Sequence, residues 1–170
     1  MSKKKSYIIY ISLIVVFVIA DLLSKIFFAN YFAGENADVV VIPNFFTFTF
    51  VKNYGAAYGM FADSTLGLTI VSIVLIVVFV VYDIFSHNGN AWYLLGVGGI
   101  VGGAIGNLID RLFLGYVRDF ISIKIFSFVF NLADLFITIG VISFAIYMIL
   151  SAIKESKEKG KKDDKVDNTK

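Results

Sequence analysis

Two aspartates stand at the edges of strongly apolar segments, where a charged side chain is costly to place. Asp119 follows one such segment, and Asp134 lies at the beginning of another. Ionisable side chains at the end of a bilayer span are rare and usually have a function. Two neighbouring carboxyl groups can share one proton, so that one serves as an acid while the other serves as a base. These residues therefore favour acid–base chemistry carried out by a carboxyl pair.

The composition is that of a membrane protein. Of the 170 residues, 58% are hydrophobic and only 16% are charged, whereas soluble domains carry about 25% charged residues. The apolar residues form long blocks, each close to the ~20 residues that a bilayer span requires. We predict an all-α membrane protein, a four-transmembrane-helix bundle that forms one domain over residues 1–153, with spans at about 7–28, 66–85, 92–111 and 132–153.

Lysines at both ends of the chain predict its orientation. Three of them precede the first span, at residues 3–5, and seven follow the last span, within residues 154–170. Positive residues collect on the cytoplasmic side of membrane spans, so we place both termini in the cytoplasm. The first apolar block lacks a small-residue cleavage site, so we expect it to remain as a span. The charged segment 154–170 is expected to be a disordered cytoplasmic tail.

The connection between the first two spans contains a strand pattern. Phe46, Phe48 and Phe50 alternate with other residues, and this period of two is typical of a half-buried strand. The pair Pro43–Asn44 predicts a turn between this strand and an earlier one. We therefore expect a small extracytoplasmic β-sheet at about residues 39–51, resting on the outer membrane surface.

The alternating direction of the spans brings most of their polar side chains to the outer side of the membrane. The inner ends of the spans carry no comparable cluster in this interpretation. Glycines four residues apart in the third span, at positions 98, 102 and 106, allow neighbouring helices to approach closely. The residues that converge at the outer side are Asp21, Lys25, Asn53, Asn107, Asp110, Arg111, Asp119, Asn131 and Asp134.

The two aspartates also have structural interpretations. Asn131 is a suitable helix N-cap, and Asp134 is favoured beside the helix dipole, so capping explains this pair as well as catalysis does. Asp119 could form a solvated surface pair with Arg118 on an exposed loop. The presence of both aspartates beside one short loop favours the catalytic interpretation.

The charged residues inside the spans have alternatives of the same kind. Asp110 and Arg111 could form an interhelical ion pair that only holds the bundle, or Arg111 could anchor a substrate carbonyl or a lipid headgroup. Asp21 and Lys25 lie four residues apart on one helix face and are expected to form a local or interhelical pair. The run Asn53–Gly55 could be only a turn.

The composition gives little support to metal or nucleotide chemistry. The chain has no cysteine and a single histidine, His87, so a zinc site is not expected. The glycine-rich run lies inside a span and lacks the strand–loop–helix context of a nucleotide-binding loop. The terminal lysines are interpreted as topology determinants. We expect no cofactor, no metal and no nucleic-acid partner.

Five motifs, in order along the chain, resemble those of the lipoprotein signal peptidases, also called signal peptidase II. The resemblance covers almost the whole chain except the charged tail. Its runs are Asp21–Lys25 (DxxTK-like), Asn53–Gly59 (NxGAAxG), Gly102–Arg111 (GGAxGNxxDR), Gly115–Phe120 (GxVxDF) and Phe130–Asp134 (FNxAD). The chain departs from the family pattern at Leu22, at Leu135 and in the lack of a proline before Phe130. These departures bear on the rate of cleavage and on substrate preference and not on the type of reaction.

The resemblance implies an aspartic endopeptidase of the bacterial cytoplasmic membrane that is sensitive to globomycin-type inhibitors, and we expect the protein to be a monomer. Its substrate would be a prolipoprotein whose cysteine already carries diacylglycerol, cut just before that cysteine near the extracytoplasmic face, among membrane lipids. The catalytic pair maps onto Asp119 and Asp134, and we expect Asp134 to be the base and Asp119 the acid. The supporting residues are Asn53, Gly55, Asn107, Arg111 and Asn131, with Asp21, Lys25 and Asp110 in structural roles.

Two other functions fit some of these features. Intramembrane charged residues could mark the ion path of a small transporter or channel, which requires polar residues across the whole membrane depth. The third possibility is a non-catalytic assembly or chaperone subunit. Cleavage of a lipid-modified peptide without metal or nucleotide distinguishes the enzyme from both.

Overall fold

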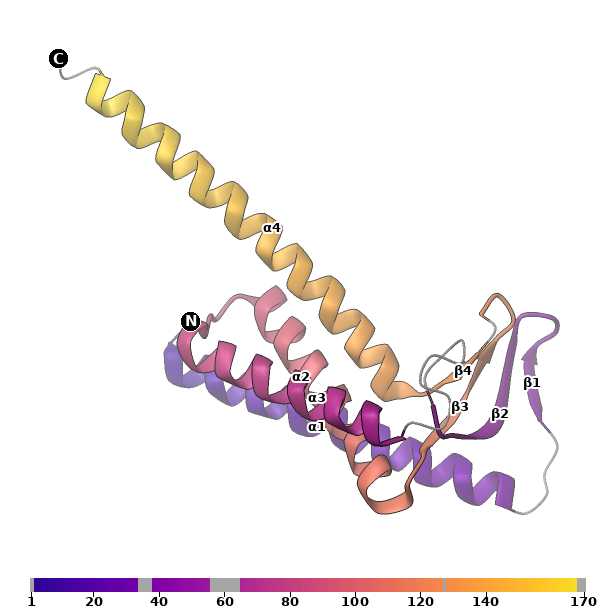
Figure 1. Ribbon diagram of the computed structural model, residues 1–170. Coiled ribbons are helices and arrows are strands. Elements are labelled where there is room, and N and C mark those ends of the chain that lie inside the picture. The colour runs from indigo at the N-terminus through magenta and orange to yellow at the C-terminus, as the bar shows by residue number, and fades with distance from the viewer. Residues whose placement is uncertain (1, 34–37, 56–64, 127, 168–170) are drawn as a thin grey trace.

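Four helices and a small sheet make up the part of the chain that the computed structural model describes (Figure 1). The structure describes residues 2–33, 38–55, 65–126 and 128–167, and only the backbone of 161–167. The end of the NxGAAxG motif, after Gly55, lies outside the described residues. The elements are α1 (Lys3–Ala33), β1 (Val39–Ile42), β2 (Phe46–Asn53), α2 (Thr65–Ser86), α3 (Ala91–Leu114), β3 (Val117–Ile123), β4 (Val129–Phe130) and α4 (Leu132–Asp167).

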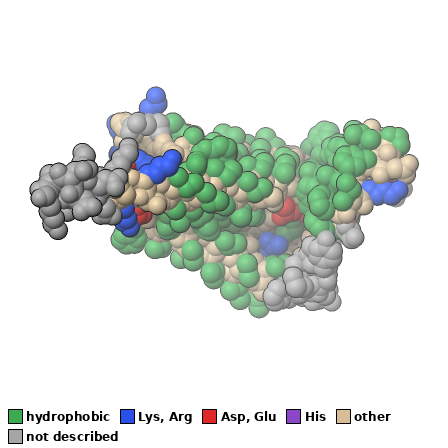
Figure 2. Space-filling view, turned by 90° about the horizontal axis from the view of Figure 1, so that it is seen from above, with side chains coloured by type: hydrophobic (Ala, Val, Ile, Leu, Met, Phe, Trp, Pro, Cys, Tyr) green, Lys and Arg blue, Asp and Glu red, His purple; other side chains and the backbone are tan. Residues whose placement is uncertain are grey.

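The predicted fold class is confirmed. All four helices are long and apolar enough to cross a bilayer. α1, α2 and α4 expose many large apolar side chains, as helices in contact with lipid do, and hydrophobic side chains cover much of the molecule in Figure 2. α3 is mostly buried, because the other three helices pack against it. Both termini lie at the end of the bundle away from the sheet (Figure 1).

Glycines allow α3 to occupy the centre of the bundle. A Cβ atom added at Gly103 would collide with the carbonyl oxygen of Ala133 in α4. A Cβ atom at Gly106 would collide with the Asp21 carboxylate of α1. The close approach predicted from the glycine spacing is therefore confirmed, and it brings polar groups of α1 and α4 against the same part of α3.

The sheet is antiparallel, in the order β1-β2-β3-β4, so the predicted strands at 39–51 form only half of it. The segment after α3 was expected to be a loop, and that expectation is wrong: it forms the hairpin of β3 and β4. Val117, Asp119 and Phe120 of β3 are all buried. Burial of neighbouring residues on both faces hides the period of two by which a strand is recognised in a sequence.

α1 continues beyond its predicted end near residue 28 and holds the sheet with its last turns. The ring of Phe28 stacks on Phe120 of β3 with centroids 4.3 Å apart, and it lies 4.6 Å from the ring of Phe48 in β2. Each aromatic pair of this kind contributes about 0.5–1.5 kcal/mol beyond its buried area. These contacts fix β3, and with it Asp119, against the helices.

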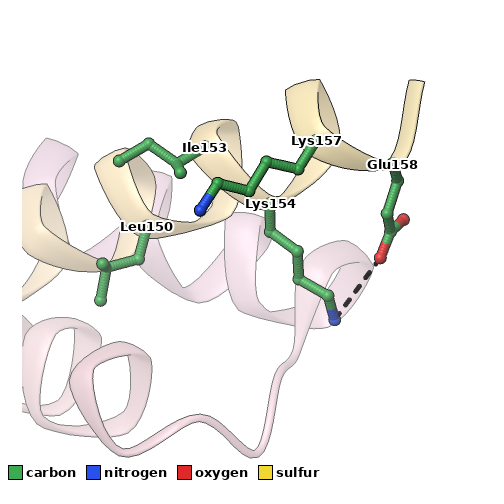
Figure 3. Close-up of a pocket in the computed structure, with 5 residues that line it drawn as sticks. All are labelled: Leu150, Ile153, Lys154, Lys157 and Glu158. Carbon is green, nitrogen blue, oxygen red and sulfur yellow. Dashed lines mark ion pairs between the residues drawn. The ribbon is translucent and has the colours of Figure 1, made fainter. Parts of the chain in front are cut away.

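The charged tail departs from the expected disorder, because α4 continues as a helix through Asp167 and projects beyond the bundle (Figure 1). Ion pairs four residues apart support this extension: Glu155 lies 2.7 Å from Lys159, and Lys154 lies 4.0 Å from Glu158. Such pairs, together with the good helix propensity of Lys and Glu, favour a helix without a buried face. Figure 3 shows where the apolar surface of α4 gives way to charge, at Leu150, Ile153, Lys154, Lys157 and Glu158.

Candidate active site

Asp134 lies in the first turn of α4 and is held there by reciprocal capping. Its backbone N–H donates to Asn131 Oδ1 at 3.1 Å, and its Oδ2 accepts from the backbone N–H of Asn131 at 3.2 Å. The capping interpretation of this pair is therefore correct. Capping occupies only one oxygen of the Asp134 carboxylate. The other oxygen, Oδ1, accepts a hydrogen bond from Asn107 Nδ2 at 2.7 Å.

Asp119 lies on β3 and is only 1% exposed, so it is not part of a solvated surface pair. Its Oδ1 accepts from Asn131 Nδ2 at 2.6 Å, and its Oδ2 accepts from Asn53 Nδ2 at 2.7 Å. Asn131 thus bridges the two aspartates, with its side chain on Asp119 and its backbone on Asp134. We call Asp119 and Asp134 the carboxylate pair.

Each of the amides around the carboxylate pair has its orientation fixed by a partner at its oxygen. Asn53 Oδ1 accepts from the backbone N–H of Gly55 at 3.0 Å, which confirms a turn at this point. Asn107 Oδ1 accepts from Lys25 Nζ at 2.8 Å and from Asn131 Nδ2 at 3.1 Å. Because the oxygens are occupied, the NH₂ groups must face the carboxylates.

A second group of charges lies beside the carboxylate pair and consists of Asp21, Lys25, Asp110 and Arg118, which we call the ion cluster. Lys25 Nζ lies 2.7 Å from Asp21 Oδ2 and 3.7 Å from Asp110 Oδ2, with both Lys25 and Asp21 side chains fully buried. The guanidinium of Arg118 donates to Asp110 through Nη2 at 2.6 Å and through Nε at 3.1 Å. These four residues pair opposite charges and tie α1, α3 and β3 together.

The structure also decides between the alternatives for the charges of the spans. Asp21 and Lys25 form the expected pair, and Asp21 Oδ1 reaches α4 by accepting from the backbone N–H of Ala133 at 2.9 Å. Asp110 pairs with Arg118 and Lys25 and not with its neighbour Arg111. Arg111 Nη1 instead donates to Ser72 Oγ of α2 at 3.3 Å.

The carboxylate pair faces a cavity of about 800 Å³ between the helices and the sheet. Arg111, Asn53 and Gly55 also line it, so five of the seven residues predicted as catalytic or supporting meet there. Acidic and basic side chains are exposed near this end of the molecule, among hydrophobic ones (Figure 2). Of the predicted supporting residues, Asn107 and Asn131 lie behind the carboxylates. The apolar wall of the cavity comprises Leu68, Ile123, Phe126, Phe128, Val129, Phe130 and Leu135.

The surroundings of Asp119 favour its protonated form. The pKa of this carboxyl is raised to about 7, mainly by burial and next by the negative charge of Asp134. Hydrogen bonds from Asn53 and Asn131 act in the opposite direction and lower the pKa. A carboxyl group of this kind can hold a proton near neutral pH and donate it, as a general acid requires.

Some residues of the site could not be recognised from the sequence pattern. Ser72 is a hydroxyl in an otherwise apolar stretch, and its isolation there was the available signal. Arg118 was considered only as a partner of Asp119, whereas it binds Asp110. Phe126 and Phe128 belong to the unpredicted hairpin region and enter the cavity wall only through the fold.

Comparison with known proteins assigns the family. The family model described as Signal peptidase (SPase) II matches residues 13–150. A lipoprotein signal peptidase of Desulfitobacterium hafniense is 38% identical over 151 residues, which cover 88% of this chain and 98% of that protein. One of Caldanaerobacter subterraneus subsp. tengcongensis is 46% identical over 109 residues, covering 64% of this chain and 74% of that protein.

Solved structures agree with this assignment. A bacterial membrane enzyme determined by the in meso method at 2.3 Å resolution superposes with a TM-score of 0.73 at 31% identity, covering 84% of this chain and 88% of that chain. A second such structure, at 1.9 Å resolution, gives a TM-score of 0.69 at 32% identity, covering 82% and 91%. The chain therefore belongs to the signal peptidase II family and is a multi-pass membrane peptidase.

Proposed function

We propose that this protein is an aspartic endopeptidase that removes the signal peptide from diacylglyceryl-modified prolipoproteins, cutting just before the lipid-bearing cysteine. Membership of the signal peptidase II family supports the substrate class. The observation that carries the proposal is the carboxylate pair itself: Asp119 and Asp134 line one cavity and are bridged by Asn131.

The reaction follows from the different surroundings of the two carboxyl groups. Asp134, at the N-terminus of α4, is favoured as the carboxylate that takes a proton from water. The resulting hydroxide adds to the peptide carbonyl carbon while Asp119, whose pKa is about 7, donates its proton to the carbonyl oxygen. The proton that Asp134 took from water then passes to the amide nitrogen, the C–N bond breaks as a hydroxyl of the intermediate returns its proton to Asp119, and the signal peptide leaves with a free carboxyl group. The amides of Asn53, Asn107 and Asn131 keep both groups in position during these transfers.

The position of the cavity suits a substrate that is itself held in the membrane. Its apolar wall, which includes Leu68 and Phe128, can accept a hydrophobic signal segment or acyl chains that arrive by lateral diffusion. Arg111 lines the same cavity and supplies a positive charge for a carbonyl or headgroup. With both termini in the cytoplasm, as their lysines favour, the cavity faces the extracytoplasmic side.

The test is cleavage of a diacylglyceryl-modified peptide by the purified protein and by the variants Asp119→Asn and Asp134→Asn. Each variant is expected to lose about 10³-fold or more of kcat while it keeps its fold, because Asn cannot transfer the proton. Asp38→Asn, at an exposed aspartate beside the sheet, is the matched control and should retain full activity. Unchanged cleavage in either variant of the pair refutes the proposed mechanism. Globomycin-type compounds are expected to inhibit the wild type.

A further inference from the structure

Lys25 of α1 is a fully buried cation that lies behind the carboxylate pair and outside the wall of the cavity. Its Nζ atom lies 2.7 Å from Asp21 Oδ2 and 3.7 Å from Asp110 Oδ2. It also donates a hydrogen bond of 2.8 Å to the side-chain oxygen of Asn107. Three oxygen atoms thus surround a group that has three donors and no acceptor.

The Asn107 carboxamide connects Lys25 with both members of the carboxylate pair. Asn107 Oδ1 accepts from Lys25, and Asn107 Nδ2 donates to Asp134 Oδ1 at 2.7 Å. The same oxygen accepts from Asn131 Nδ2, which also donates to Asp119 Oδ1 at 2.6 Å. The lysine therefore reaches Asp134 through one amide and Asp119 through two.

Lys25 determines which end of the Asn107 carboxamide faces Asp134. Because a lysine offers donors only, the amide oxygen must lie beside it, and the NH₂ group is then turned toward Asp134. Half a turn of the carboxamide would place its oxygen against the Asp134 carboxylate and its NH₂ group against Lys25. Without Lys25, the oxygen of Asn107 depends on the longer bond from Asn131 Nδ2, at 3.1 Å. The orientation of Asn107 would then be held much less firmly.

A role limited to ion pairing explains this arrangement less well. Asp110 already receives two hydrogen bonds from the Arg118 guanidinium, at 2.6 and 3.1 Å, and Lys25 is farther away. Burying a lysine is costly, and a buried ion pair often stabilises a protein no more than apolar residues of similar volume do. A buried lysine that donates to a neutral amide of the active site is better placed to orient that amide than to add stability.

We propose that Lys25 is a positioning residue of the peptidase reaction, because it fixes the Asn107 carboxamide and, through it, the geometry of both members of the carboxylate pair. This inference rests on the proposed function of that pair. Lys25 acts from behind the site and touches neither the substrate nor the attacking water. Its loss should therefore slow the chemical step and leave substrate binding almost unchanged.

Lys25 also influences how strongly Asp119 holds its proton. The positive charge of Lys25 lowers the pKa of this carboxyl, against the larger effects of burial and of the Asp134 charge, which raise it. Removal of Lys25 should thus raise the pKa of Asp119, so that the acid keeps its proton to higher pH. The other charged groups on the elements packed around Asp119 are Asp134 of α4, Asp21 of α1, Asp110 and Arg111 of α3, Lys52 of β2 and Arg118 of β3 itself.

The first test measures cleavage of the diacylglyceryl-modified peptide by Lys25→Met, which removes the donor and the charge. We expect kcat to fall about 10²-fold and KM to change by less than about threefold, because a displaced catalytic group affects the rate and Lys25 does not line the cavity. The alkaline limb of the pH–rate profile should move to higher pH. An unchanged kcat, or a limb that stays in place, overturns the proposal.

The matched control is Lys124→Met. It breaks another lysine–asparagine hydrogen bond, from Lys124 Nζ to Asn44 Oδ1 at 3.0 Å, on the exposed side of the sheet. This variant should keep the kcat, the KM and the pH profile of the wild type.

A double variant separates positioning from stability. Lys25→Met leaves Asp21 buried without its counter-charge and should lower the apparent Tm, whereas adding Asp21→Asn removes both charges and should recover most of that loss. The kcat of the double variant should stay about 10²-fold below that of the wild type, because Asn107 still lacks its donor. Recovery of kcat together with stability would mean that Lys25 is only structural. If Lys25→Met does not fold, the double variant takes its place in the kinetic tests.

Failure of this inference can be distinguished from failure of the proposed function by measuring Asp119→Asn in the same assay. If the wild type does not cleave the peptide, or if Asp119→Asn cleaves it equally well, the proposed function is wrong and the role of Lys25 is wrong with it. If Asp119→Asn is inactive while Lys25→Met retains full kcat, only the role given to Lys25 is overturned.

Discussion

The carboxylate pair and the ion cluster lie side by side, and both consist of buried aspartates, yet their partners differ in kind. Asp21 and Asp110 are matched by the cations Lys25 and Arg118. The carboxylate pair instead receives its hydrogen bonds from neutral asparagine amides and from the backbone of Asn131, and it borders a cavity.

We interpret this difference as one between structural ion pairs and the pair that we propose to be catalytic. In the ion cluster each carboxylate lies beside a cation that balances its charge, so structural pairing accounts for it. A buried carboxyl beside neutral donors and a second carboxyl is pushed toward protonation, as Asp119 is. Lys25 links the two regions, because it pairs with Asp21 and also fixes the amide of Asn107 that supports Asp134.

The largest effect should come from exchanging Asp for Asn in each region. Asp119→Asn is expected to reduce kcat by about 10³-fold or more with little change in thermal stability. Asp110→Asn should do the reverse: it removes the carboxylate that Arg118 holds, costs about 3 kcal/mol of stability, and leaves the rate per folded molecule within about tenfold. Peptide cleavage and thermal unfolding of both variants in the same detergent measure this. An equal loss of activity in Asp119→Asn and Asp110→Asn would contradict the different roles given to the carboxylate pair and the ion cluster.

A smaller effect is expected from removing one neutral donor. Asn53→Ala leaves Asp119 Oδ2 without its hydrogen bond, and the rate should fall by about 10²-fold because the acid is no longer fixed in position. The same bond lowers the pKa of Asp119, so its loss should move the alkaline limb of the pH–rate profile to higher pH. A profile that stays in place, or moves to lower pH, would contradict the role given to Asn53.

The pH dependence expected of the wild type follows from the acid role that we propose for Asp119. Its pKa of about 7 means that the required proton is present below this pH and is lost above it. We expect kcat/KM to fall about tenfold for each unit above that value. Initial rates measured over a pH series, at pH values where the protein remains folded, give the profile. A constant rate up to pH 9, about two units above the midpoint, would remove Asp119 from the acid role.

The smallest effect should be at the charged extension of α4. The Lys154–Glu158 pair is 4.0 Å long and both side chains are mostly exposed, so it contributes about 0.5 kcal/mol or less. Glu158→Gln should leave cleavage unchanged and shift the apparent Tm by roughly 1 °C at most. A change comparable with that of Asp110→Asn would mean that the extension packs against another part of the protein.

The sequence by itself determined the membrane class, the four spans and the identity of the carboxylate pair. Apolar blocks of about 20 residues match the thickness of a bilayer, and acidic residues at their ends indicate a function because their burial is costly. The glycine spacing of the third span also predicted close packing, since the absence of a side chain is a local property. The first hairpin was visible because phenylalanines alternate with other residues at 46–50 and Pro43–Asn44 marks a turn before them.

Other features were decided by tertiary structure. β3 is covered on both faces, so its strand period is absent from the sequence. The partner of each aspartate depends on which elements pack together. Asp110 pairs with Arg118, seven residues beyond Arg111, because the turn after α3 brings β3 back against Asp110. Likewise, Ser6 and His87 are 81 positions apart and meet only because α1 and α2 pack on the same helix. Composition and local pattern are properties of single segments and can be recognised in the sequence. The hydrogen bonds around each buried aspartate come from several segments, which only folding brings together.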